Sequence, residues 1–212
     1  MSARGAGPCL ARFGGERLGY CVGIVPSTER QEAVKQFLSN PIVRTAGLFV
    51  ALFAIGFATR MPAWQFPHIY ALHGVLAAPF CAALAAWHLV RGGSVVQLVA
   101  ATALLAVVLG MMSPAMGLSF ALVAALTLAV RACLRSVPAA MRSVAVAAVF
   151  GALDYPCALA VGLALGSYGP SAEALPMIAL LLALSVALSL FGAFVAAFLA
   201  DRRSAKCSNS SS

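Results

Sequence analysis

The stretch FGALDYPCAL, at residues 150–159, places a carboxylate inside an otherwise apolar run. If the run crosses a membrane, an aspartate near its centre costs about 2.5–3.5 kcal/mol on insertion scales and should face a bundle interior or a wet cavity. Tyr155 adds a hydroxyl, and Pro156 has no N–H to bond the carbonyl of Ala152. The spacing predicts a bent, polar patch in which Asp154 and Tyr155 bind a solute or couple to protons. The alternative is a protonated Asp154 that is hydrogen-bonded within the bundle.

Other candidates for the same site lie elsewhere in the chain. Tyr70 and His73 are three residues apart, so a helix would place both on one face. They are expected either to line an outward-facing pocket above Asp154 or to belong to the aromatic belt at the membrane interface. Met112 is part of a methionine cluster that could flank an apolar ligand, with lipid contact or packing as the alternative.

Several kinds of chemistry have no motif in this chain. It lacks GxSxG, the GxSG of rhomboid-type proteases, HExxH and a second intramembrane acid for a two-carboxylate mechanism. It also lacks the GxxxxGKS/T loop of ATPases, so active transport would draw its energy from a partner or an ion gradient. Its six cysteines form no CxxC and no zinc-spaced Cys/His cluster. We therefore expect neither an enzyme nor a bound metal or other cofactor.

Composition assigns the chain to the integral membrane proteins. Of its 212 residues, 62% are hydrophobic and 9% are charged, whereas soluble domains carry about 25% charged residues. Long apolar runs favour an all-α bundle over a β-barrel. The basic residues behind the net charge of +8 lie between these runs, so they predict control of membrane topology and not nucleic-acid binding.

The apolar runs predict a compact bundle of six transmembrane helices. One long run is divided at Ser113–Pro114, because a capping residue followed by proline begins a helix and one crossing needs about 20 residues. The spans are expected at about 41–59, 67–90, 95–112, 114–130, 143–166 and 174–200. If both termini are inside, 13 of the 14 lysines and arginines are cytoplasmic, and Arg60 is outside. This bias predicts a multi-pass protein of the cell membrane with cytoplasmic termini.

Two segments flank the predicted transmembrane domain, which covers residues 41–203. Residues 1–40 predict a mostly disordered cytoplasmic extension, with a short surface helix over about Glu29–Leu38 that Thr28 would cap. Residues 204–212 are polar and predict a disordered tail.

Small residues recur along the first span. Gly47, Ala51, Ala54 and Ala58 are separated by four, three and four residues, so they share one helix face. Small residues at this spacing allow two helix backbones to approach closely in lipid. We call this surface the small-residue face and expect it to be a partner interface.

Taken together, these features resemble the substrate-binding S component of an energy-coupling factor (ECF) vitamin transporter, over residues of about 40–203. The resemblance rests on six spans, cytoplasmic termini, the AxxxA of Ala54 and Ala58, and the basic end of GAFVAAFLADRR. It implies uptake of one small solute, a vitamin or related micronutrient, bound near the outer face. It also implies that Ala54 and Ala58 dock on a transmembrane coupling subunit driven by two cytoplasmic ATPases.

The resemblance also implies how the pocket would close. The outer loops at 60–67, 113–116 and 167–174 would cover it, with Trp64 as a lid. The family's metal-binding branch keeps a histidine at its extreme N-terminus, which this chain lacks, so nickel and cobalt are disfavoured.

Two other functions fit parts of the pattern. A non-transporting membrane scaffold of MreD type would have the same number of spans and a similar size. A proton-coupled secondary transporter would use Asp154 as its proton relay, but a single intramembrane acid and the lack of an evident inverted repeat weigh against it.

Overall fold

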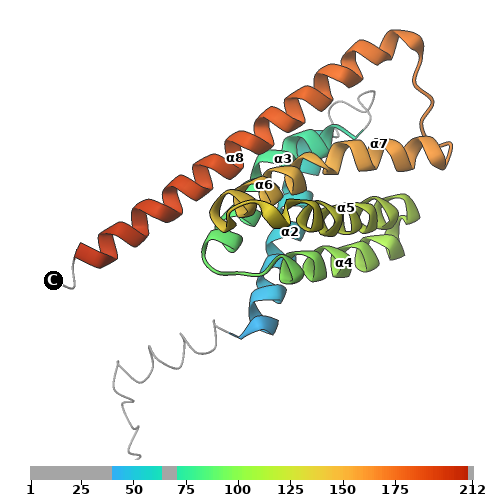
Figure 1. The fold of residues 1–212 in the computed structure, drawn as a ribbon. Coiled ribbons are helices and arrows are strands. Elements are labelled where there is room, and N and C mark those ends of the chain that lie inside the picture. Colours follow the sequence, from blue (N-terminus) through green and yellow to red (C-terminus); the bar gives the residue numbers. More distant parts are fainter. Residues whose placement is uncertain (1–39, 64–70, 210–212) are drawn as a thin grey trace, which may run out of the picture. The chain divides into compact units, whose positions relative to one another are not determined.

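The computed structural model describes residues 40–63 and 71–209, which belong to one compact unit, Phe37–Ser212. All secondary structure in these ranges is helical (Figure 1). The elements are α2 (Pro41–Ala63), α3 (Leu72–Val90), α4 (Val95–Met112), α5 (Pro114–Cys133), η1 (Leu134–Ser136), α6 (Ala139–Ala152), α7 (Asp154–Ala164), η2 (Ala172–Ala174) and α8 (Leu175–Asn209). The all-α class is confirmed. The predicted surface helix, Trp64 and Tyr70 lie outside the described residues.

Six helical segments are long and apolar enough to cross a membrane, which is the predicted number. They are Pro41–Arg60, Leu72–Val90, Val95–Met112, Pro114–Ser136, Ala139–Ala164 and Ala172–Arg202. The fifth segment consists of two helices, α6 and α7, that meet at Leu153.

Local hydrogen bonds build the helix starts. The side-chain oxygen of Asn40 accepts a 3.0 Å bond from the N–H of Ile42, as expected for a cap before Pro41. Ser113 is the cap residue of α5 and alone separates it from α4, so these two helices form a tight hairpin. At the start of α4, Ser94 and Gln97 form a capping box through two bonds of 3.2 and 3.1 Å.

Several helix bounds differ from the predicted ones. α3 begins at Leu72 instead of 67, directly after Ala71, whose backbone is left-handed. α2 continues to Ala63, past its expected end at 59, and includes Pro62 in its last turn. α6 begins at Ala139 instead of 143, directly after Pro138. α8 continues to Asn209, so residues 204–209 of the tail expected to be disordered are helical. The sequence SAKCSN has no residue that breaks a helix.

Close backbone packing holds the helices together. α8 turns a stripe of small, buried residues inward: Ser185, Ser189, Gly192, Ala193 and Ala196. Gly192 lies directly against the carbonyl of Pro79 on α3. Gly151 on α6 lies against Ala78 and Ala82, which also belong to α3. Contacts of this kind are a main attraction between helices in lipid. α3 is therefore the helix around which α2, α6 and α8 pack.

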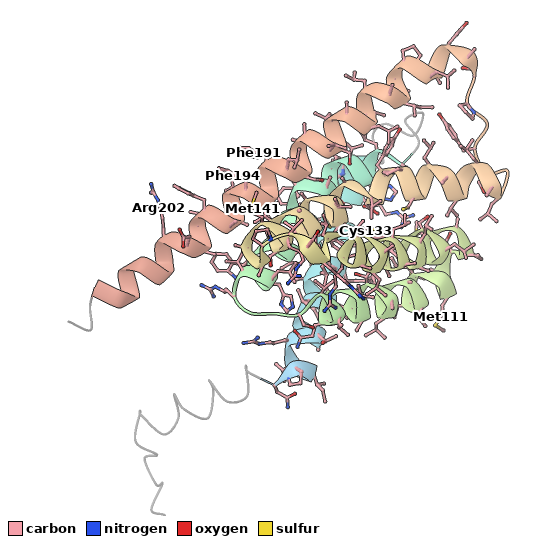
Figure 2. All side chains as sticks on the ribbon, viewed as in Figure 1. Met111, Cys133, Met141, Phe191, Phe194 and Arg202 are labelled. Carbon is pink, nitrogen blue, oxygen red and sulfur yellow. The ribbon has the colours of Figure 1, made fainter. Side chains whose placement is uncertain are left out.

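The outward-facing side chains are largely apolar. Figure 2 shows Phe191 and Phe194 projecting from α8, where they are 66% and 67% exposed. Met111 on α4 and Met141 on α6 are also exposed. Side chains of this size and polarity suit contact with lipid acyl chains.

Arginines gather at one end of the bundle. Arg44 at the start of α2 and Arg91 at the end of α3 line the same pocket, so these two helices are antiparallel. Alternation of the following helices brings further arginines to that end: Arg131, Arg135, Arg142 and Arg202. At the opposite end Arg60 donates a 3.2 Å hydrogen bond to the sulfur of Met116. We call the end of the bundle that carries Arg44 and Arg91 the basic end.

Candidate functional site

The candidate site lies at the break between α6 and α7. The N–H of Leu153 still bonds to Val149, at 2.9 Å, and the N–H of Cys157 bonds back to Leu153, at 3.0 Å. Pro156 has no N–H to continue this ladder, so the helix is interrupted where the sequence predicts a bend. Asp154 is thereby the first residue of α7, and the positive end of that helix dipole favours its carboxylate.

Asp154 lies inside the bundle, as expected, with 8% of its surface exposed. Its side chain lines a cavity of about 30 Å³. The polar lining consists of Asp154, His73 of α3 and Thr102 of α4, with the thiol of Cys81 nearby on α3. The remaining lining is apolar: Leu52, Gly56, Ala77, Leu105, Phe120, Val123 and Phe150. Residues of α2 to α7 thus surround one small, mostly apolar space that a few polar groups reach.

Of the residues that line the cavity, His73 can carry a positive charge and Asp154 a negative charge. The two side chains therefore share a site in which a cation or a proton would interact with both. The hydroxyl of Thr102 donates a 2.9 Å bond to the carbonyl of Leu98, which leaves its oxygen as an acceptor toward the cavity.

Close approach of α3 to α7 brings these two residues to the same space. A Cβ built on Gly74 would lie 3.1 Å from both the N and the Cα of Tyr155, so the two backbones touch at this point. His73 is the neighbour of Gly74, and Asp154 is the neighbour of Tyr155. A larger residue at position 74 would push the site apart.

Other predicted site residues lie elsewhere. Tyr155 is fully buried, but it packs with Val75 and Leu181 in a separate cluster and does not line the cavity. Met112 is 78% exposed at the end of α4 and also lies outside the lining. A role for either residue in solute binding stays a prediction.

Two polar lining residues were missing from the sequence prediction. Thr102 and Cys81 lie within spans but share no motif with Asp154. Thr102 is a lone hydroxyl between Leu98 and Leu105, and this isolation within an apolar run is the signal that could have indicated it. Within residues 40–63 and 71–209, no three His, Cys, Asp or Glu side chains are placed to hold a metal ion.

The small-residue face of α2 is open. Gly47, Ala54 and Ala58 are exposed, and Ala51 is half-buried. A Cβ built on Gly47 meets no atom within 4 Å, so no described helix packs on it. The face is sterically available to another helix.

In comparisons with protein families, curated proteins and solved structures, no match to this chain was found.

Proposed function

We propose that this protein is the membrane-embedded substrate-binding subunit of an uptake system, and that Asp154 and His73 engage its solute. The observation that carries the proposal is the enclosed cavity at the helix break, which both side chains line. An acid inside a membrane bundle is costly, so its placement opposite an imidazole marks a functional site in preference to a packing site.

The size of the cavity defines which part of the solute it holds. A volume of about 30 Å³ accommodates a group the size of one water molecule, whereas pockets for whole small molecules measure about 300–1,000 Å³. The solute would therefore place one cationic or hydrogen-bond-donating group, such as an ammonium, between Asp154 and His73. The rest of a vitamin-sized solute would require the helices around the cavity to separate.

Energy for uptake would come from partner proteins. In the S component reading, the small-residue face docks on a transmembrane coupling subunit that two cytoplasmic ATPases drive. The open surface of Ala54 and Ala58 supports this assignment, because unpacked small residues admit a close helix partner. The arginine bias toward one end supports cytoplasmic termini in the cell membrane.

A second candidate function is proton-coupled transport. The small cavity favours it, because a proton or hydronium fits between a carboxylate and an imidazole without any helix movement. In this case Asp154 and His73 would exchange protons, and no ATPase would be needed.

Purification of the full-length chain from its own cells, in mild detergent, separates these functions. A substrate-binding subunit should retain two ATPases and one membrane subunit in a fixed ratio, and Ala54→Trp should release them. Ala100→Trp, at an exposed position on α4, is the matched control and should keep them. A proton-coupled carrier should purify without ATPases and acidify proteoliposomes as solute enters. A scaffold of MreD type should purify with neither property.

A further inference from the structure

A second concavity lies at the basic end, between the start of α2 and the end of α3. Of its lining, the proposed function uses only Gly47, which belongs to the small-residue face. Its volume is about 270 Å³. Arg44 reaches it from α2 and Arg91 from α3, so two cationic side chains on antiparallel helices face one space. Gly47 lines the same space and leaves it open, because it has no side chain to fill it.

Several contacts hold the polar groups of this pocket in place. The guanidinium of Arg91 lies 3.9 Å from the ring centroid of Trp87, which is a cation–π contact. The Nε2 atom of His88 lies 3.3 Å from the carbonyl oxygen of Ser94, so this nitrogen carries the donated proton. A Cβ on Gly93 would overlap the His88 ring, so the turn after α3 closes directly over that ring. Arg91, Trp87 and His88 are thus ordered before any ligand arrives.

The pocket combines this charge with an apolar wall. Leu48 is buried and Leu84 half-buried, and both line the pocket. Leu48 lies one helical turn from Arg44, and Leu84 two turns from Arg91, toward the bundle centre. Arg44 itself lies within the apolar segment Pro41–Arg60. A ligand that fits would carry a negative headgroup toward the arginines and an apolar portion along the leucines.

We infer that this pocket binds the phosphate of an anionic lipid headgroup, from the leaflet at the basic end, between Arg44 and Arg91. The inference rests on membrane insertion but not on solute uptake. Basic pockets between transmembrane helices are a known way for proteins to hold acidic lipids. Guanidinium groups suit the task because their planar donors match phosphate oxygens in pairs. A free phosphate ion would satisfy the same arginines, but it would make no use of the apolar wall.

The test is native mass spectrometry of the full chain, released from nanodiscs of phosphatidylcholine with a minor share of phosphatidylglycerol. The wild type should retain one phosphatidylglycerol. A double variant, Arg44→Gln with Arg91→Gln, should retain at least about tenfold less. Arg135→Gln, an exposed arginine at the same end but outside the pocket, is the charge control and should retain the lipid.

A second variant guards against misfolding of the first. Gly47→Leu keeps both arginines but fills the pocket, so it should also lose the lipid. Equal retention of phosphatidylglycerol by Gly47→Leu and the wild type would overturn the inference, as would equal retention by a folded double variant. Displacement of the lipid by millimolar inorganic phosphate would assign the arginines to a free anion and overturn the lipid assignment.

Discussion

The contact between Gly192 and Pro79 makes a quantitative prediction about the α3–α8 interface. A methyl group at position 192 would overlap the Pro79 carbonyl oxygen and lie 2.9 Å from its carbonyl carbon and 3.0 Å from its Cα. Both of these are backbone atoms in the middle of a helix, so they cannot move aside as a flexible side chain would. Overpacking of this kind costs about 1–3 kcal/mol. The higher helix propensity of alanine returns up to about 1 kcal/mol. With the full gain, Gly192→Ala should therefore lower the free energy of unfolding by up to about 2 kcal/mol.

Gly47→Ala is the matched control, because it makes the same change in a helix where a Cβ meets open space. It should be neutral or stabilise the protein by up to about 1 kcal/mol through propensity alone. The measurement is reversible unfolding in mixed micelles with increasing dodecyl sulfate, followed by circular dichroism. If Gly192→Ala proved as stable as Gly47→Ala, the close approach of α8 to α3 would be refuted.

Three further predictions follow from the membrane arrangement and the site. In intact cells a membrane-impermeant maleimide should label a cysteine placed at Gly169, between α7 and α8, but not the exposed native Cys133 at the basic end. Inverted membranes should show the reverse labelling, and labelling of Cys133 in intact cells would contradict cytoplasmic termini. Asp154→Leu should raise the free energy of unfolding by up to about 3 kcal/mol, because it replaces a buried carboxylate with an apolar side chain of the same branching. A loss of stability would instead indicate a structural role for Asp154. Gly74→Val should weaken solute binding without touching the cavity, since it pushes α3 away from Tyr155; unchanged binding, measured by the solute retained after purification, would contradict the proposed close approach.

The sequence predicted the helices well, because apolar run length is a strong signal in a membrane protein. The start of α5 at Pro114 and the bend before Pro156 both came from proline, whose missing N–H acts locally and needs no tertiary information. The same local reasoning failed beyond Thr59 and in the C-terminal tail. At the end of α2, the two prolines within residues 60–67 predict a loop, but the helix includes Pro62. In the tail, the polar residues predict disorder, although none of residues 204–209 is a glycine or proline.

The site was harder to predict, because its members come from different helices. The cost of burial alone was enough to expect that Asp154 faces inward. Its partners depend on how far each helix is rotated about its axis, and spacing within one span does not give this angle. Tyr155 shows the limit: it is adjacent to Asp154 in the chain, but a step of one residue in a helix turns it toward Val75 and Leu181. Thr102 lies far away in sequence, yet it lines the cavity.

Native mass spectrometry of the gently solubilised protein tests the central claim most directly. The wild type should carry one small molecule in stoichiometric amount, and both Asp154→Asn and His73→Ala should lose it. Asp201→Asn, which removes an exposed acid on α8, should retain it. A small molecule that Asp154→Asn and His73→Ala hold as firmly as the wild type would contradict the assignment of the cavity as the solute site.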